Sequence, residues 1–307
     1  MRTRFTGVGT ALITPFHADG SLDEAAVTRL ARRQVDAGVH FLSPCGTTGE
    51  APTLSPREKL RVIELVVEAA DGRVPVLAGA GGYDTREVIE FVREVEKTGA
   101  DGLLSVTPYY NKPTQEGLYQ HFKAIAESTA LPIMLYSVQG RAGVNINVDT
   151  VVRLAGIKNI VAIKEASGSI GQMADIINAT PEDFLVLSGD DPLTIPLMAL
   201  GGHGVVSVAS NEAPAEMAQL VELCEGGDYA AARPLFYRLL PLIQVNFVET
   251  NPIPVKAAMA AMGLVEEAYR LPMVPPSAAA REKILRVLQQ LRLPGAVPAE
   301  DAAAARA

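Results

Sequence analysis

Eight short apolar runs, each followed by a longer segment of helical periodicity, alternate along most of the chain. The runs are Val8–Thr14, Phe41–Pro44, Val74–Leu77, Gly102–Val106, Pro132–Tyr136, Ile160–Ile163, Phe184–Leu187 and Gly204–Val208. Because each connection carries a helix, this alternation predicts parallel strands. An open, doubly wound sheet is compatible with it. Eight evenly sized units favour an α/β fold closed into a (β/α)8 TIM barrel, which typically takes about 250 residues.

The predicted helices have clear end signals. Ser55 and Glu58 stand at capping-box spacing, and Pro56 takes the first helical position. Asp84 is predicted to cap the following helix, and Gly99 to end that helical stretch.

After Gly227 no further strand is expected. Three segments of helical pattern follow, at 229–247, 252–264 and 277–291. We therefore predict a barrel over residues 1–228 and an appended C-terminal helical domain over 229–296. The tail 297–307 carries little apolar surface to bury, and we expect it to be disordered.

Charge and composition exclude several classes of protein. The 307 residues are 48% hydrophobic and carry a net charge of −8, which argues against nucleic acid or an anionic membrane as a partner. No apolar run reaches the roughly 18 residues that a membrane span requires. With only Cys45 and Cys224, a disulfide scaffold is excluded, and a reducing cytoplasm is the expected location. The four histidines lack metal-ligand spacing.

Polar groups that can carry chemistry follow the strands rather than precede them. Barrel enzymes place their sites at the carboxyl ends of the strands. Those ends lead into "CGTTGE", "TPYYNKP", "YSVQGRAG", "KEASG" and "SGDD", whereas the opposite ends read "DGRVP", "GADG" and "TALP", which are ordinary turns. The sequence therefore predicts an active site on one rim of the barrel.

Lys164 is the candidate nucleophile of this rim. It follows the apolar run Ile160–Ile163, and partial burial of an amine disfavours its ammonium form. A free amine attacks a ketone to give a Schiff base, whose protonated form withdraws electrons from the neighbouring carbon. The alternative is a lysine whose stem covers apolar surface while its amine reaches water.

Imine formation requires a proton carrier. Tyr136 ends the strand that neighbours the one bearing Lys164, and Thr47 and Thr48 lie on the rim after the second strand. A phenol has an unperturbed pKa of about 10, so a relay of hydroxyls would have to assist it. The alternatives are a core aromatic residue and a pair of threonines in a helix-cap turn.

Two further groups are expected near the same rim. Arg141 follows Tyr136 by five residues, and its planar guanidinium suits a carboxylate substrate; the alternative is a surface salt bridge. Of the consecutive Tyr109 and Tyr110, at most one should face the site if the segment is extended.

Three motifs resemble ligand sites but are not interpreted as such. "AGAGGYD" lacks both the dinucleotide spacing and the Walker lysine. Asp191 precedes Pro192 and indicates a helix start rather than a metal ligand. "LGGHG" offers backbone N–H groups to a phosphate, but Asp190 and Asp191 are expected nearby. We predict no metal and no nucleotide.

The motifs "GTTGE", "TPYYNKPTQEGLYQHF", "KEASG", "LSGDD", "GGHGVVSV" and "FVETNPIPVKAAM" together resemble the dihydrodipicolinate synthase family of pyruvate-dependent class I aldolases. The family is also called 4-hydroxy-tetrahydrodipicolinate synthase. The resemblance extends from about Phe5 to Leu291. It implies condensation of pyruvate with L-aspartate 4-semialdehyde in diaminopimelate and lysine biosynthesis, without a metal or an organic cofactor.

The resemblance also implies roles for individual residues. Lys164 would form the Schiff base with pyruvate. Tyr136, Thr47 and Tyr110 would form the proton relay, with Tyr110 supplied across a subunit interface of a homotetramer built from two tight dimers.

Four other positions would bind the substrates. Thr48 would hold the pyruvate carboxylate and Arg141 the carboxylate of the semialdehyde. Backbone groups of Gly189 and Val206 would line the pocket near the lysine.

One loop departs from the family pattern Tyr-Asn-Val-Pro-x-Arg-Thr-Gly. Ser137 and Gln139 stand in place of Asn and Pro, and Ala142 in place of Thr. Without Pro, the loop loses a fixed φ and gains an N–H that needs a partner. The departure bears on the orientation of Arg141, and therefore on which aldehyde the enzyme accepts and on the reaction rate.

Feedback inhibition by lysine is expected to be weak or absent. Regulated members place polar side chains around an interface pocket, and Glu87 and Tyr109 match that pattern. Four positions differ from it: Pro52, Pro56, Lys59 and Tyr83.

Two rival functions remain at this stage. One is another lyase of the same group, acting on N-acetylneuraminate, a 2-keto-3-deoxy sugar acid or 4-hydroxy-2-oxoglutarate. Arg141 favours an amino-acid-like acceptor over a polyol. The other is a non-catalytic keto-acid-binding protein, against which the Lys, Tyr and Thr set argues.

Overall fold

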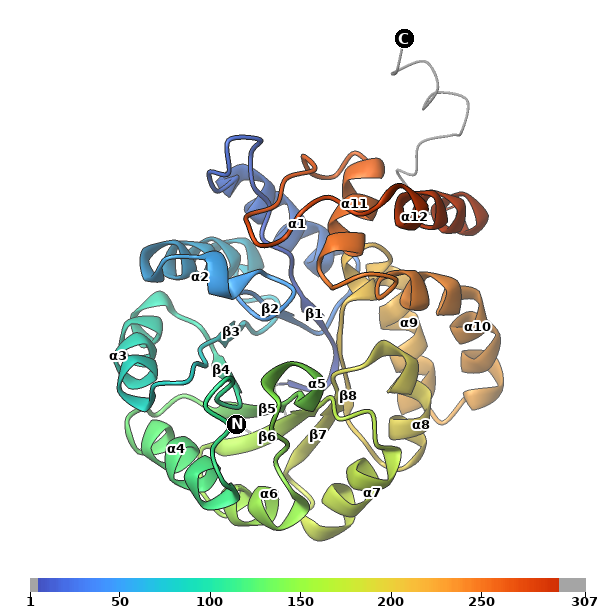
Figure 1. Cartoon of the computed structure of the whole chain (residues 1–307). Helices are drawn as coiled ribbons and strands as arrows, with labels where there is room; N and C mark the ends of the chain where they lie inside the picture. The colour runs from blue at the N-terminus through green and yellow to red at the C-terminus, as the bar shows by residue number, and fades with distance from the viewer. Residues whose placement is uncertain (1–4, 293–307) are drawn as a thin grey trace.

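Eight parallel strands form a ring at the centre of the computed structural model, which describes residues 5–292 (Figure 1). Their order is β2-β1-β8-β7-β6-β5-β4-β3, and the Leu42–Val76 bridge joins the two ends. The predicted barrel is confirmed, and the open sheet is wrong. The strands are β1 Gly7–Ala11, β2 Phe41–Ser43, β3 Leu77–Gly79, β4 Gly102–Val106, β5 Ile133–Ser137, β6 Ile160–Glu165, β7 Leu185–Ser188 and β8 Gly204–Ser207.

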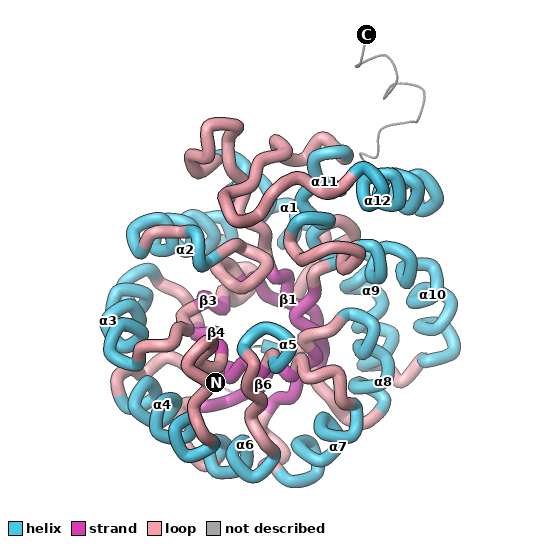
Figure 2. The backbone as a smooth tube through the Cα atoms, viewed as in Figure 1, coloured by secondary structure: helices cyan, strands magenta, loops and turns pink. Residues whose placement is uncertain are grey.

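Helices surround the strands, as Figure 2 shows in cyan around magenta. The outer layer consists of α1 Glu24–Asp36, α2 Pro56–Ala70, α3 Thr85–Val95, α4 Gln115–Glu127, α6 Val148–Ala155, α7 Ile170–Ala179, α8 Thr194–Ala199 and α9 Pro214–Glu225. Short helices in the connections are η2 Ala51–Thr53, η3 Glu96–Thr98, α5 Gln139–Ala142, η4 Asp191–Leu193 and η5 Ala209–Asn211.

The predicted helix-end signals are present. Ser55 Oγ accepts from the Glu58 N–H while the Glu58 carboxylate accepts from the Ser55 N–H at 2.9 Å, which completes the capping box. Asp84 accepts from the Arg86 N–H, and Gly99 ends η3 with φ +84°. A positive φ is readily adopted by glycine, which lacks a Cβ.

Seven of the eight strands differ from their predicted bounds, four of them by a single residue at one or both ends, while the first ends at Ala11 rather than Thr14. The third and sixth differ for identifiable reasons. The third begins at Leu77 rather than Val74, because Pro75 has no N–H to donate and Val76 forms only a single bridge. The sixth continues beyond Ile163, so that Lys164 lies inside the ladder, paired with Tyr136 on β5 and Leu187 on β7.

Alternating side chains along the strands divide the core in two. On β5, Met134 and Tyr136 point into the barrel, while Ile133 and Leu135 pack outward against the helices. The barrel interior also holds Phe41, Leu104, Leu187 and Val206. Full burial of such a large apolar side chain contributes about 1.5–3 kcal/mol, so both layers stabilise the closed barrel.

The three predicted C-terminal helices are α10 Tyr229–Val245, α11 Ile253–Ala261 and α12 Ala278–Leu291. Helix α10 packs directly against α9, and α12 packs against α10 and α11. The division at residue 228 stays a prediction, and the predicted disordered tail 297–307 lies outside the described residues. Within those residues no helix combines the length and apolarity that crossing a membrane requires.

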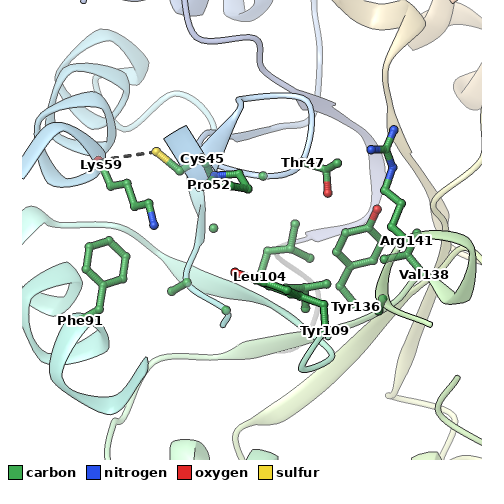
Figure 3. Close-up of a pocket in the computed structure, with 17 residues that line it drawn as sticks. Cys45, Thr47, Pro52, Lys59, Phe91, Leu104, Tyr109, Tyr136, Val138 and Arg141 are labelled. Atoms are coloured by element: carbon green, nitrogen blue, oxygen red, sulfur yellow. Dashed lines mark hydrogen bonds between the residues drawn. The ribbon is translucent and has the colours of Figure 1, made fainter. Parts of the chain in front are cut away.

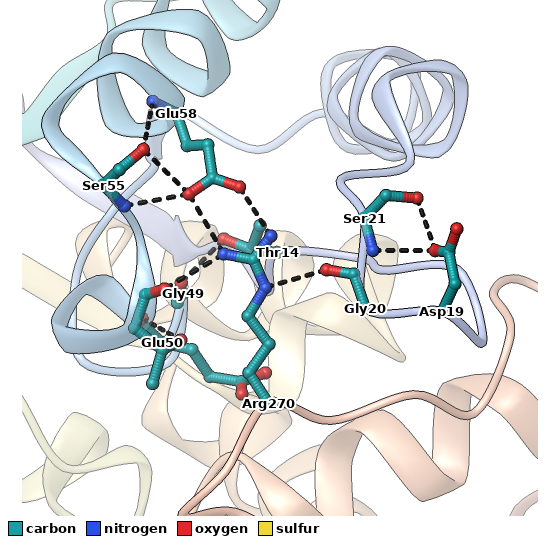
Figure 4. A network of polar contacts seen from close by, with 10 residues as sticks. Thr14, Asp19, Gly20, Ser21, Gly49, Glu50, Ser55, Glu58 and Arg270 are labelled. Carbon is teal, nitrogen blue, oxygen red and sulfur yellow. Dashed lines mark hydrogen bonds and ion pairs between the residues drawn. The ribbon is translucent and has the colours of Figure 1, made fainter.

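Buried and part-buried ion pairs fasten this C-terminal segment to the barrel. Lys256 on α11 donates to Glu50 at 2.6 Å, and both side chains are almost fully buried. Arg270 donates to Glu58 and to the Gly20 carbonyl (Figure 4). The hydrogen bond from Arg270 lowers the pKa of Glu58 to about 2. The C-terminal helices are therefore bonded to the loops that follow β1 and β2.

We expect His121 to make the fold sensitive to acid. It is buried on α4 beside Thr85, and burial lowers its pKa from 6.5 to about 4. Between these values the unfolded chain binds a proton that the folded chain does not. Stability therefore falls as the pH drops through this range, by about 3 kcal/mol in full. His121→Asn should remove most of this loss, measured by urea denaturation at pH 7 and pH 4.

His17→Asn is the matched control for this comparison. His17 is exposed, and a hydrogen bond to Glu266 raises its pKa, so its removal should not lessen the acid-dependent loss. An unchanged pH dependence in His121→Asn would contradict the prediction.

Candidate active site

A cavity of about 240 Å³ lies at the carboxyl ends of β2, β3, β4 and β5, where the sequence places the site. Thr47, Tyr136 and Arg141 line one part of it, and Lys59 and Phe91 line another (Figure 3). The hydroxyl groups of Thr47 and Tyr136 point toward one another in Figure 3. Polar groups from separate segments thus meet at one rim.

Lys164 lies next to Tyr136 inside the barrel. The two residues are direct partners in the β5–β6 ladder, and Lys164 shares the interior face with Ala162 because side chains alternate along a strand. Its Nζ lies 4.2 Å from the centroid of the Tyr136 ring, and the residue is 5% exposed. The amine therefore does not extend into bulk solvent, contrary to the alternative of a lysine reaching out to water.

Lys164 does not itself line the cavity described above; it contacts the Tyr136 ring, which does. Gly189 follows β7, and a Cβ at this position would lie 3.0 Å from Lys164 Cε and 2.6 Å from Ala166 Cβ. Glycine is thus required for the close approach of the lysine stem. Val206 on β8 is fully buried in the barrel interior.

Three carboxyl groups lie close to Lys164 in the sequence or the fold. Burial raises the pKa of Glu165, Asp190 and Asp191. Asp191 accepts from the N–H groups of Val208 and Ala209 at 2.9 and 3.1 Å, and η4 begins at Asp191 as predicted. Glu165 and Asp191 are thus buried, as Lys164 is.

The two threonines of "GTTGE" differ in their surroundings. Thr47 lines the cavity, whereas Thr48 is 3% exposed and its Oγ1 accepts from Asn251 Nδ2 at 2.9 Å. Reasoning from residue types did not single out Asn251, because it lies 203 positions away along the chain. Its only signal is its presence in the "FVETNPIPVKAAM" motif.

Arg141 is exposed on α5 and lines the cavity. Its Nη2 donates to the Asn251 carbonyl at 3.0 Å, and within residues 5–292 no salt bridge of Arg141 is found. The guanidinium is held by one backbone contact and keeps further donors for a ligand.

The altered loop "YSVQGRAG" is ordered without its proline. Ser137 Oγ donates to Asn145 Oδ1 at 2.8 Å and accepts from the Ile146 N–H at 3.1 Å. Gln139 begins the single turn of α5, where its carbonyl accepts from the Gly143 N–H. Hydrogen bonds to Ser137 and within α5 thus fix the loop that carries Arg141.

Of the two consecutive tyrosines one lines the cavity, although the segment is not extended at Tyr110 as the prediction assumed. Tyr109 lines the cavity, and its ring meets Tyr83 edge-on with centroids 5.3 Å apart. Tyr110 has φ +73° and is 92% exposed, so it projects away from the protomer. A positive φ is uncommon for a residue with a side chain.

No group of three His, Cys, Asp or Glu side chains in the described part of the chain is arranged to hold a metal. Cys45 and Cys224 are both buried and free, and burial raises the pKa of Cys45 to about 12. The polar groups gathered at the rim include an amine, a phenol, hydroxyls and a guanidinium. A buried amine beside a phenol is suited to forming an imine with a ketone.

The fold and the site together define a (β/α)8-barrel enzyme with a buried lysine on its sixth strand. The model of the Dihydrodipicolinate synthetase family matches residues 4–291. The chain belongs to this family, which confirms the resemblance seen in the sequence.

Individual relatives cover nearly the whole chain. A 4-hydroxy-tetrahydrodipicolinate synthase from Koribacter versatilis is 52% identical over 92% of this chain and 95% of its own. A dihydrodipicolinate synthase structure from Aquifex aeolicus superposes with a TM-score of 0.93 at 45% identity, covering 94% of this chain and 99% of its own. The Acinetobacter baumannii enzyme complexed with pyruvate superposes at 0.92 with 42% identity and the same coverage.

Gly189→Ala should displace the Lys164 side chain and slow its reaction with a ketone. The new methyl group would lie 3.0 Å from Lys164 Cε, closer than ordinary van der Waals contact. Misplacement of a reacting group by about 1 Å can cost roughly a hundredfold in rate. The measurement is the rate of borohydride-trapped adduct formation with pyruvate.

Gly171→Ala on α7 is the matched control, since its Cβ would meet only Ser169 Oγ at 3.8 Å. Equal trapping rates in the two alanine variants would show that the close approach of Gly189 to Lys164 is unimportant.

Proposed function

We propose that the protein condenses pyruvate with L-aspartate 4-semialdehyde to form 4-hydroxy-tetrahydrodipicolinate, a step toward diaminopimelate and lysine. The observation that carries this proposal is the placement of Lys164 Nζ 4.2 Å from the centroid of the Tyr136 ring, in an enclosed barrel. The names of the similar enzymes and the pyruvate complex of one of them support it.

Lys164 acts first, as the nucleophile. Its lone pair attacks the keto carbon of pyruvate, and the carbonyl electrons move to oxygen to give a carbinolamine. Tyr136 donates the proton with which that oxygen leaves as water, and the iminium remains. Thr47 completes the relay in the same protomer, and Tyr110 of the partner subunit extends it.

Loss of a proton from the pyruvate methyl group converts the iminium to an enamine. Its terminal carbon attacks the aldehyde carbon of the semialdehyde, and the aldehyde oxygen takes up a proton to become the hydroxyl group. The amino group of the semialdehyde then attacks the iminium carbon. This closes the ring and returns the amine to Lys164.

Two carboxylates must be bound for this sequence. Thr48 is proposed to hold that of pyruvate, and Arg141 that of the semialdehyde. Arg141 supports the second assignment, because it lines the cavity and keeps donors for a ligand. Backbone groups of Gly189 and Val206 are proposed to line the pocket beside Lys164.

The proposal also covers the oligomeric state, the cofactor requirement and the cellular location of the enzyme. The outward projection of Tyr110, 92% exposed, supports a tight dimer in which each protomer receives the partner's Tyr110. Two such dimers would form a homotetramer. We propose that the reaction needs neither a metal nor an organic cofactor, because the imine itself withdraws electrons, and that the enzyme works in the cytoplasm.

Borohydride trapping and a coupled assay test the function together. Reduction in the presence of pyruvate should add one reduced pyruvyl group at Lys164, located by peptide mass spectrometry. Supplying the semialdehyde with the downstream reductase should then consume NADPH. Lys164→Met should abolish both signals, and Tyr136→Phe should lower kcat by about a hundredfold or more because the proton carrier is lost.

Lys158→Met is the control, since this exposed lysine precedes the opposite end of the same strand. It should retain both signals. Absence of an adduct would favour a non-catalytic keto-acid-binding protein. An adduct accompanied by turnover of sugar acids alone would favour another lyase of the group.

L-Lysine should inhibit the enzyme weakly or not at all. Pro52, Lys59 and Tyr109 line the part of the cavity that contains Phe91, and the Lys59 ammonium lies 5.7 Å from the Phe91 centroid. A second ammonium group entering there would be repelled by Lys59. The measurement is an L-lysine titration in the coupled assay, and half-inhibition at micromolar concentration would contradict the expectation.

A further inference from the structure

Asn251 joins two residues of the site that come from separate strands. Its side-chain Nδ2 donates to Thr48 Oγ1 at 2.9 Å, and its backbone carbonyl accepts from Arg141 Nη2 at 3.0 Å. Thr48 follows β2, and Arg141 lies on α5 after β5. Asn251 itself belongs to the C-terminal segment, just before α11.

The direction of the Thr48 bond has a chemical consequence. A carboxamide nitrogen only donates, so Thr48 Oγ1 must accept at this contact. The hydroxyl proton of Thr48 then stays available for a different acceptor. A substrate carboxylate is such an acceptor, and hydrogen bonds to charged groups are the stronger ones.

A second contact joins the same two segments, the "GTTGE" loop and the C-terminal segment that holds Asn251. Lys256, five residues further along, forms the buried 2.6 Å ion pair with Glu50, which stands two residues after Thr48. The ammonium of Lys256 also lies 4.3 Å from the Phe16 ring centroid. Figure 4 shows Glu50 and Gly49 beside Thr14, whose hydroxyl donates to the Gly49 carbonyl. The "GTTGE" loop is thus fixed relative to Asn251.

The side-chain oxygen of Asn251 indicates a role beyond stability. Asn251 is 4% exposed, and no group within residues 5–292 forms a hydrogen bond with its Oδ1. A buried, unsatisfied polar atom costs about 1–3 kcal/mol, so stability alone does not favour Asn here.

We infer that Asn251 is a positioning residue that keeps Thr48 as a donor toward the pyruvate carboxylate and holds Arg141 over the same cavity. This role rests on the proposed function, since it presumes that the ligand is an α-keto acid. Asn251 acts through its two neighbours and does not itself contact the reacting atoms.

Asn251→Asp tests this role with almost no change of shape. The carboxylate cannot donate, so Thr48 turns its proton toward Asp and away from the substrate. We expect the KM for pyruvate to rise about ten- to a hundredfold, the worth of a hydrogen bond to a charged group, with a much smaller change in kcat. In a Thr48→Val background, the uncharged substitution Asn251→Ala should add little to KM, because its target is gone.

The matched control is Asn159→Asp. The Asn159 carboxamide also donates to carbonyls, those of Ala126 and Thr129, but at the opposite end of β6. It is expected to lower the melting temperature without raising the KM for pyruvate. Asn251→Ala serves as a second variant should Asn251→Asp fail to fold; its KM should rise less, because the Thr48 hydroxyl is then free to rotate.

Borohydride trapping of pyruvate by the unmodified enzyme distinguishes failure of the proposed function from failure of the role assigned to Asn251. No adduct would reject the proposed function and this role with it. An adduct with unchanged KM in both Asn251 variants would reject only the role of Asn251. If Asn251→Ala raised KM equally in the wild-type and Thr48→Val backgrounds, the role of Asn251 would also be rejected.

Discussion

The site depends on the register between β5 and β6. In this register Tyr136 and Lys164 are direct partners, and the pleat turns both side chains into the barrel. A shift of one residue on either strand would send one of them outward against the helices. Closure of the sheet by the Leu42–Val76 bridge leaves the strands no free edge along which to slip. Barrel closure and the placement of the amine beside the phenol are thus linked.

Burial then determines the electrostatics of the rim. Lys164 is 5% exposed, and the nearby carboxyls of Glu165, Asp190 and Asp191 have pKa values raised by the same burial. We propose that the exposed Arg141 supplies the fixed positive charge for an anionic substrate in a chain of net charge −8.

Local patterns in the sequence were sufficient for the architecture and for the rim. The alternation of runs, the Ser55 capping box and the polar segments after the strands all depend on neighbours within a few residues. The late start of β3 follows from Pro75, and the length of β6 follows from its pairing with β5 and β7. Neither could be derived from the apolar pattern alone. The bonds of Asn251 to Thr48 and of Lys256 to Glu50 join residues more than 200 positions apart. No spacing rule predicts such contacts, although the family motif contains both C-terminal partners.

A crystal structure of the protein soaked with pyruvate measures most directly whether Lys164 is the residue that captures the ketone. Continuous electron density from Lys164 Nζ to the keto carbon, with the Tyr136 hydroxyl within hydrogen-bonding distance of the new bond, is the expected result. Pyruvate bound without a covalent link, or linked to a different side chain, would contradict the role assigned to the β5–β6 pair.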